Sequence, residues 1–368
     1  MIYKPFKDGI SLSRLGLGNM RFPTTDTAGL HIDYEKAHAI IDECYKNGIN
    51  YYDTAHVYNS TDSESCLGEC MKKYPRDSFY LATKLHIDVC RDYKTMFENQ
   101  LKRLQTDYID FYLLHCLTDG NINLYLESGI IDYMLEMKAQ GKIKYLGFSS
   151  HAGLDTLEKF ASHHDWDFAQ IQLNYYDWKF STAKKEYEIL TAHNIPVMVM
   201  EPVRGGKLAK LTDDAEKLLR EARPEASDAS WAFNFVKGLP NVQVILSGMN
   251  DPAQVTDNLK TFSTDEALTP SETETLMKAA DVFRSQIIVP CTGCRYCTEG
   301  CPMKINIPEY LKLYNEYKLQ GDWALNGAGR INSEGTPAQC IGCGSCRALC
   351  PQSINIPYYM EQLAKLIK

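Results

Sequence analysis

Short apolar runs alternate with amphipathic stretches along most of the chain. The runs are brief and rich in Ile, Val, Leu, Tyr and Phe, which is typical of strands in a buried parallel sheet. We predict strands at Arg14–Met20, Ile49–Thr54, Phe79–Thr83, Tyr108–Leu114, Ile143–Ser149, Phe168–Asn174, Val197–Glu201 and Val242–Leu246. The stretches between them predict helices with recognisable ends. One begins at Asp33 and closes at Gly48, another stops at Gly141, and a third has Asp251 as N-cap and Pro252 as its first residue.

The number of repeats indicates the architecture. Eight strand–helix repeats in roughly 285 residues suit an α/β fold of the (β/α)8 TIM-barrel type, which typically takes ~250 residues. A doubly wound sheet is the competing interpretation, but no complete G-x-G-x-x-G follows the first strand. Asp8-Gly9, between two short strand-like runs, predicts a hairpin that closes the floor of the barrel.

A second part of the chain begins near Val289 and Pro290 and contains a duplicated cysteine motif. Each copy reads C-x2-C-x2-C-x3-C-P, and each cysteine of the second copy lies 49 residues after its counterpart. The tails Ile305-Asn-Ile-Pro308 and Ile354-Asn-Ile-Pro357 match as well. The interval between the copies, Pro308–Trp323, has helical spacing. We therefore expect a barrel over residues 1–285 and a small, mainly helical domain over residues 286–368.

This cysteine spacing is the one by which bacterial ferredoxins bind [4Fe–4S] clusters, with the fourth cysteine of each motif serving the other cluster. The spacing predicts one cluster held by Cys291, Cys294, Cys297 and Cys350, and a second held by Cys340, Cys343, Cys346 and Cys301. Structural zinc and buried thiols are the alternatives, although a four-cysteine zinc site usually draws its ligands from two distant pairs. The helical interval resembles the α-helical ferredoxin modules attached to larger redox enzymes. Both a one-electron relay and a purely structural role stay open for the clusters.

Composition and charge narrow the functional classes. The 368 residues carry a net charge of -8 with no basic block, which argues against a nucleic-acid-binding protein. No apolar stretch is long enough to predict a membrane span, and the N-terminus lacks the apolar core of a secretory signal. We therefore expect a cytoplasmic protein, in which the 13 cysteines are metal ligands or buried thiols rather than disulfides.

Polar residues gather where the predicted strands end, which is where barrel enzymes carry their chemistry. Asp53, Lys84 and His115 lie at the ends of the second, third and fourth predicted strands, and Tyr58 follows in the loop after the second strand. A nearby lysine ammonium favours the phenolate and lowers a tyrosine pKa, so Lys84 would make Tyr58 a better proton donor. Asp53 would hold Lys84, and His115 would orient a substrate carbonyl.

These residues resemble the catalytic tetrad of the aldo-keto reductases, and the resemblance covers residues 1 to 285, with the cysteine-rich tail matching the iron–sulfur branch of that family. The matching motifs are D-T-A-x-x-Y from Asp53 to Tyr58, Ala82-Thr83-Lys84, and Leu113-Leu114-His115. The resemblance implies reduction of an aldehyde or ketone with NADPH or NADH, or the reverse alcohol oxidation. It also implies cofactor contacts at Gly18, Asn19, Met20, Ser149, Ser150, Gln170, Met200, Gly205, Gly206, Asp257 and Asn258.

The chain departs from the family pattern after the last predicted strand. The family usually carries a Lys and an Arg there that grip the 2′-phosphate of NADPH, whereas this chain has Gly248, Met249 and Gln254. Without these cations the charge-assisted clamp is missing, and NADH becomes plausible. Met200 replaces the aromatic residue that stacks on the nicotinamide, and Ser150 replaces the usual Asn.

Two hypotheses from different classes follow. The first is a carbonyl reductase with a fused dicluster domain, acting on a small carbonyl or alcohol substrate with a ferredoxin or flavoprotein as redox partner. The second is an electron-transfer subunit, or a cluster-driven reductase, whose barrel does not use nicotinamide directly. The altered clamp favours the second hypothesis, and the intact tetrad favours the first.

Overall fold

The computed structural model describes residues 1–26 and 31–367, which form two compact units. The first unit comprises Met1–Val203 and Ala229–Thr273, and the second comprises Arg204–Asp228 and Glu274–Lys368. The second unit thus contains a segment that lies in the middle of the sequence. The division that we expected between residues 285 and 286 stays a prediction.

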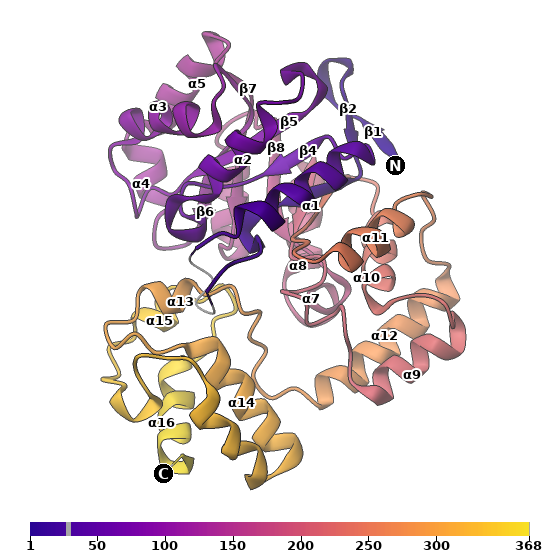
Figure 1. Cartoon of the computed structure of the whole chain (residues 1–368). Helices are drawn as coiled ribbons and strands as arrows, with labels where there is room; N and C mark the ends of the chain where they lie inside the picture. The colour runs from indigo at the N-terminus through magenta and orange to yellow at the C-terminus, as the bar shows by residue number, and fades with distance from the viewer. Residues whose placement is uncertain (27–30, 368) are drawn as a thin grey trace. The chain divides into compact units, whose positions relative to one another are not determined.

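The first unit is a barrel (Figure 1). Among the described residues, eight parallel strands close on themselves in the order β10-β3-β4-β5-β6-β7-β8-β9. Their bounds are β3 Leu15–Gly18, β4 Tyr51–Asp53, β5 Tyr80–Leu85, β6 Ile109–Leu117, β7 Ile143–Ser150, β8 Phe168–Gln172, β9 Val197–Met200 and β10 Val242–Ser247. This topology confirms the predicted (β/α)8 barrel and excludes the doubly wound sheet.

Strand lengths differ from the prediction at the functional end of the barrel. β5 continues to Leu85 and β6 to Leu117, so Lys84 and His115 lie within strands rather than just beyond them. β3 ends at Gly18, and Asn19 begins the 3-10 turn η2 (Asn19–Arg21). The apolar runs set the approximate position of each strand, whereas the neighbouring strands set where the hydrogen-bonded ladder stops.

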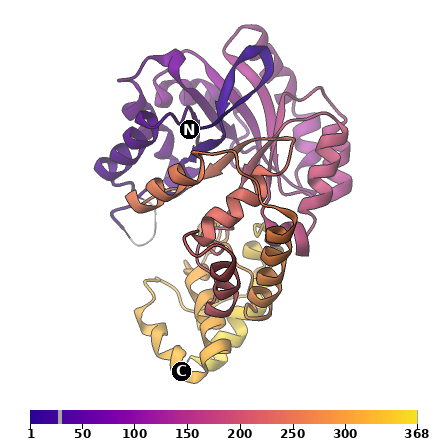
Figure 2. The same ribbon diagram turned by 90° about the vertical axis from the view of Figure 1, so that its right-hand side faces the viewer.

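Helices surround the strands, as Figure 2 shows from a second direction. The helices of this unit are α1 Tyr34–Lys46, α2 Ser63–Met71, α3 Tyr93–Leu104, α4 Ile122–Glu127, α5 Ile130–Ala139, α6 Leu154–Ala161, α7 Tyr175–Phe180, α8 Ala183–Ala192, α10 Asp228–Lys237 and α11 Pro252–Thr261. The predicted N-cap Asp251 is confirmed, and Asp33, at which we predicted a helix to begin, is the N-cap of α1. The Asp33 side chain accepts from the Lys36 backbone N–H at 3.2 Å, and Asp251 accepts from Ala253 at 2.7 Å.

The predicted N-terminal hairpin is confirmed. β1 (Tyr3–Pro5) pairs antiparallel with β2 (Ser11–Ser13), and the turn between them includes Asp8 in the left-handed conformation, with φ of 56°. Phe6, Ile10 and Leu12 pack against the aromatic core inside the barrel, where the Phe6 and Phe111 ring centroids are 5.5 Å apart. The hairpin therefore closes one end of the barrel with apolar side chains.

The second unit contains the cysteine repeat. Its helices are α9 Asp213–Ala222, α12 Pro270–Ser285 for the most part, α13 Tyr296–Glu299, α14 Ile307–Gln320, α15 Ser345–Ala348 and α16 Ile356–Leu366, with 3-10 turns η5 Asp322–Arg330 and η6 Pro337–Gln339. The helix predicted over Pro308–Trp323 corresponds to α14, which ends at Gly321 because that residue has a φ of 80°. Ile305 and Ile354, the matching residues of the two repeats, are both buried in one apolar core.

No helix in the described part of the chain is long and apolar enough to cross a membrane.

The barrel core constrains Gly147 on β7. A Cβ atom at Gly147 would lie 2.4 Å from the Phe168 carbonyl oxygen on β8, so the two paired strands would have to separate. We expect Gly147→Ala to lower the free energy of unfolding by about 1–3 kcal/mol, the usual cost of overpacking. Thermal unfolding followed by circular dichroism measures the effect.

The matched control is Gly329→Ala in the second unit. No described atom lies within 4 Å of a Cβ atom built there, and its φ is not positive. This variant should unfold at the temperature of the unsubstituted protein. Equal unfolding temperatures for both variants would contradict the packing argument.

Candidate active site and cluster-binding loops

The four residues of the predicted tetrad lie together at the carboxyl ends of three adjacent strands. Asp53 ends β4, Lys84 lies near the end of β5, and His115 lies near the end of β6. Tyr58 begins the short turn η3 (Tyr58–Thr61) after β4. All four side chains are buried. The parallel register places them on one face of the barrel because successive strands end at the same edge.

Lys84 and Asp53 form an ion pair inside the barrel. The Lys84 Nζ donates to Asp53 Oδ1 at 2.5 Å and to the Thr54 carbonyl oxygen at 2.7 Å. Burial raises the pKa of Asp53 and lowers the pKa of Lys84, while their mutual attraction and hydrogen bond oppose both shifts. Because Lys84 is fully buried, its ammonium depends on Asp53 for its charge.

Tyr58 lies beside this ion pair. The Lys84 Nζ is 5.0 Å from the centroid of the Tyr58 ring. We expected Lys84 to lower the pKa of Tyr58, but burial raises that pKa well above its usual value, and the nearby Asp53 carboxylate raises it further. The tyrosine is therefore fully protonated at rest. The sequence shows that a lysine is near, but it does not show how deeply the phenol is buried.

His115 faces Tyr58 across the site. Their ring centroids are 5.9 Å apart with planes at 83°, and the ring of His86 lies 5.4 Å from His115. Burial lowers the pKa of His115 well below its usual value, and the Lys84 charge lowers it further. His115 is thus a neutral imidazole, and its buried Nδ1 has no hydrogen-bond partner among the described residues.

The predicted cofactor contacts of the first unit also gather at the strand ends. Gly18 ends β3 and is followed by Asn19 and Met20, while Ser149 and Ser150 lie on β7, Gln170 on β8 and Met200 on β9; Asp257 and Asn258 lie on α11 instead. Gly205 and Gly206 belong to the second unit.

The side chains of Asn19 and Gln170 contain buried polar atoms suited to a ligand. Both side-chain polar atoms of Asn19 and the Oε1 of Gln170 are buried without a hydrogen-bond partner in the described chain. The Gln170 Nε2 contacts the Met200 sulfur at 3.7 Å. An amide oxygen left unpaired costs free energy, and the carboxamide of a nicotinamide would satisfy it. These residues therefore fit the implied cofactor.

Two other predicted cofactor contacts, Ser149 and Asn258, form hydrogen bonds within the protein. The Ser149 hydroxyl accepts from the Cys116 backbone N–H at 2.8 Å, and Asn258 donates to the Ser247 hydroxyl at 3.0 Å. In the region of the missing clamp, Gln254 accepts from the backbone N–H of Asn250. That glutamine therefore stabilises its own turn.

One charged pair near the strand ends was not predicted. Arg21 in η2 donates to Glu201, the residue after β9, at 3.1 Å. The Arg21 side chain also packs against Gly248, where a Cβ atom would meet it at 3.3 Å. Residues far apart in the sequence meet here, and no local pattern around either of them indicates the pairing.

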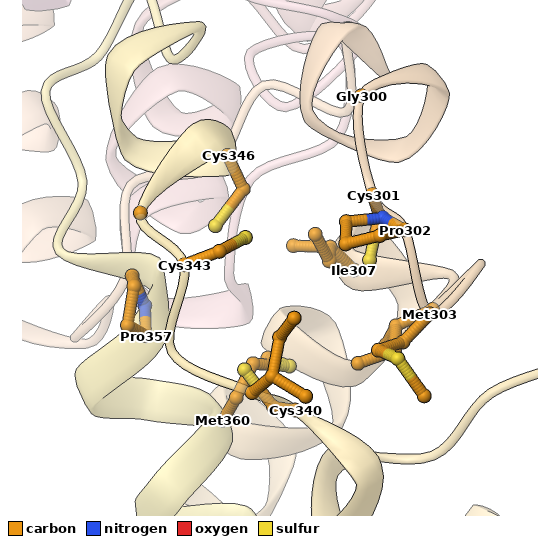
Figure 3. Close-up of a pocket in the computed structure, with 13 residues that line it drawn as sticks. Gly300, Cys301, Pro302, Met303, Ile307, Cys340, Cys343, Cys346, Pro357 and Met360 are labelled. Atoms are coloured by element: carbon orange, nitrogen blue, oxygen red, sulfur yellow. The ribbon is translucent and has the colours of Figure 1, made fainter.

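The cysteines of the second unit surround two pockets. Cys301, Cys340, Cys343 and Cys346 line one pocket, and Cys291, Cys294, Cys297 and Cys350 line the other. Figure 3 shows the first pocket, into which the sulfurs of Cys343 and Cys346 point from one side, with Cys301 on the opposite side. Each pocket therefore combines three cysteines of one repeat with the fourth of the other repeat.

The two cysteine loops share a backbone conformation. Gly293 and Gly342, at equivalent positions, have φ of 68° and 67°, and Lys304 and Ser353 both have φ of 51°. Left-handed residues turn the chain tightly, so that successive cysteine side chains face the same space. In the described chain no three His, Cys, Asp or Glu side chains converge on a position for a single metal ion. Four sulfurs spread around a pocket fit a cluster of several irons.

Comparison with known proteins identifies two families along the chain. The profile of the Aldo/keto reductase family matches residues 14–281, and that of the 4Fe-4S dicluster domain matches residues 290–354. The uncharacterized oxidoreductase YqkF of Bacillus subtilis is 26% identical over 285 residues, which cover 68% of this chain and 87% of that protein.

Solved structures resemble the barrel. The holo form of aldo-keto reductase AKR11C1 from Bacillus halodurans is 26% identical, with a TM-score of 0.61 over 76% of this chain and 96% of that one. An aldo/keto reductase from Klebsiella pneumoniae, solved in complex with NADP and acetate, is 21% identical, with a TM-score of 0.58 over 76% of this chain and 94% of that one. The second likeness supports the fold alone.

The histidines of the site predict a pH dependence. Burial lowers the pKa of His151 to about 4, and that of His115 lies well below its usual value. The unfolded chain binds these protons near pH 6.5 and the folded chain does not. The free energy of unfolding should therefore fall as the pH drops below 6.5, by about 1.4 kcal/mol per pH unit for each histidine.

Nitrogen-15 NMR of the imidazoles tests this expectation. At pH 6, the His115 and His151 signals should be those of neutral rings in the folded protein. The same protein unfolded in urea serves as the control, with titration near pH 6.5. A charged His115 ring at pH 6 in the folded protein would contradict the assigned environment.

Proposed function

The chain belongs to the aldo/keto reductase family, as an oxidoreductase fused to a 4Fe-4S domain, and from this premise we propose that it reduces an aldehyde or ketone with a nicotinamide cofactor. The reverse oxidation of an alcohol uses the same groups. The observation that carries the proposal is the buried Lys84–Asp53 pair, 2.5 Å long, beside Tyr58 and His115. These residues combine a proton donor, a cation and a neutral hydrogen-bonding group in one site.

Each side chain has a chemical task. Tyr58 holds the proton that the carbonyl oxygen takes up, and burial keeps it on the phenol until substrate arrives. Lys84 stabilises the phenolate left behind, through its positive charge 5.0 Å from the ring. The neutral His115 orients the carbonyl oxygen toward Tyr58 by hydrogen bonding.

The nicotinamide, when bound, supplies a hydride. Gln170 and Asn19 would hold its carboxamide end through the buried polar atoms that lack partners in the described chain. Because Gly248, Met249 and Gln254 stand where the phosphate-gripping cations are usual, the chain can use NADH as well as NADPH.

The cysteine pockets would hold two [4Fe–4S] clusters. We assign Cys291, Cys294, Cys297 and Cys350 to one cluster, and Cys301, Cys340, Cys343 and Cys346 to the other, because each set lines one pocket. Thiolate ligands in these tight loops match the donor set that such clusters require. We infer a cytoplasmic location from the sequence, where reduced thiols would be available as cluster ligands.

A one-electron partner is proposed from the exposure of the second cluster pocket. Its ligand Cys343 is exposed, and the neighbouring apolar side chains Ile341 and Leu349 are 65% and 45% exposed. A ferredoxin or flavoprotein could approach this cluster closely. The same observation favours the alternative function, an electron-transfer subunit whose barrel does not turn over nicotinamide.

Tyr58→Phe tests the proposed chemistry. The variant loses the proton donor, so kcat for reduction of an aldehyde such as 4-nitrobenzaldehyde should fall at least about 100-fold. Iron content and nucleotide binding should be unchanged. The assay follows NADH and NADPH consumption anaerobically.

Tyr45→Phe is the matched control, since that hydroxyl contacts Ser78 on the surface, 2.8 Å away. It should retain full activity. Full activity in Tyr58→Phe would contradict the catalytic role assigned to the tetrad. Absence of nucleotide binding in the unsubstituted protein would favour the electron-transfer alternative.

Single cysteine substitutions test the cluster assignment. Cys297→Ala and Cys343→Ala should each remove one cluster and leave the other, because they remove ligands from different pockets. The measurement is iron and sulfide content together with EPR of the reduced protein. Cys90→Ala is the control, since Cys90 lies in the barrel unit near Asp92 and should keep all iron. Loss of the same EPR signal in both cluster variants would contradict the assignment.

A further inference from the structure

Arg204 opens the segment of the second unit that follows β9 in the sequence. Its guanidinium Nη1 donates to the Pro290 carbonyl oxygen at 2.8 Å, and Nη2 donates to Gln352 Oε1 at 2.5 Å. The residue is only 6% exposed. A long charged side chain is thus buried among residues that come from both cysteine repeats.

Both acceptors border ligands of one proposed cluster. Pro290 precedes Cys291, and Gln352 is two residues beyond Cys350. Gln352 also lines the pocket that contains these two cysteines. Cys291 and Cys350 belong to different repeats, so a group that holds Pro290 and Gln352 together also holds the two ligand-bearing segments together.

The backbone of Arg204 indicates that its side chain is needed. Arg204 has a φ of 50°, and the following Gly205 and Gly206 have φ of 64° and 85°. Glycine would adopt this left-handed conformation without strain, whereas arginine adopts it only when the surroundings hold it. The two hydrogen bonds of the guanidinium are such a restraint.

The guanidinium also brings a charge. Arginine stays protonated in proteins, and both of these acceptors are neutral oxygens. The guanidinium donates to the carbonyl oxygen of Pro290, the residue before Cys291, and to Gln352, which lines the same pocket as Cys291. The loop after β9 therefore places positive charge close to Cys291.

We propose that Arg204 is a positioning residue for the Cys291–Cys350 cluster, which clamps its two ligand segments and raises its reduction potential. Reduction adds one electron and so one negative charge to the cluster. A buried cation nearby stabilises the reduced form, since net charge and burial set cluster potentials. Neither acceptor of Arg204 lines the pocket of the other cluster, so we expect the effect on that cluster to be smaller. The inference rests on the proposed cluster ligands.

The experiment is an EPR-monitored redox titration of the full-length, anaerobically reconstituted protein. Arg204→Gln should lower the reduced-to-oxidised ratio of the Cys291–Cys350 cluster about tenfold at a fixed potential, a shift of about 59 mV for one electron. Arg204→Lys keeps the charge but lacks the two-pronged donor, so its shift should be smaller. The cluster signals are assigned by their loss in Cys297→Ala and Cys343→Ala.

Arg220→Gln is the matched control, because it removes the same charge from an exposed position on α9, where Arg220 pairs with Glu216. It should shift neither potential. Unchanged potentials in Arg204→Gln at full iron content, or an equal shift in Arg220→Gln, would overturn the proposal. If Arg204→Gln loses iron from the Cys291–Cys350 cluster alone, the clamp is supported, and a shift of about 59 mV or more in iron-replete Arg204→Lys, which keeps the charge, would then overturn the charge effect. An error in the proposed cluster ligands is detected separately, because the unsubstituted protein would then contain fewer than two clusters.

Discussion

The barrel site depends on one buried ion pair. Lys84 is an ammonium with no access to solvent, and its contacts with Asp53 and Thr54 offset the cost of removing it from water. Because Asp53 ends β4 and Lys84 lies on β5, the pair also fixes the mutual position of two strands. The Lys84 charge acts on both neighbouring side chains. Its Nζ lies 5.0 Å from the centroid of the Tyr58 ring, and it lowers the pKa of His115. Removing one partner would leave the other charge buried and unpaired.

Much of this arrangement could be predicted from the sequence, because it follows from periodicity and spacing. Apolar runs located the strands, and the residues that follow them share one end of any parallel barrel. The cysteine repeat predicted two ligand sets, each with three cysteines of one repeat and the fourth of the other. Each of the two pockets is lined by one of these sets. The raised pKa of Tyr58 was not predictable, since it depends on burial by distant side chains. Nor was the environment of Arg204, whose acceptors come from two other segments.

The chain connects two kinds of electron chemistry. A hydride carries two electrons at once, whereas each cluster passes one. The sequence runs from Met200, at the end of β9, into the second unit at Arg204 within four residues. The sequence after β9 thus continues directly into the unit that contains Cys291 and Cys350. The proposed proton transfer by Tyr58 involves no cluster, so the proposed barrel chemistry can be measured independently of the clusters.

Isotope transfer tests the central claim, that the tetrad serves hydride transfer from a nicotinamide. The protein is incubated anaerobically in ordinary water with 4-nitrobenzaldehyde and NADH or NADPH deuterated on the transferable position, and the alcohol is analysed by mass spectrometry. The account predicts one deuterium on the carbinol carbon of each product molecule. Alcohol formed without deuterium, with its hydrogen taken from solvent, would show that electrons reach the substrate by another route and would contradict the account.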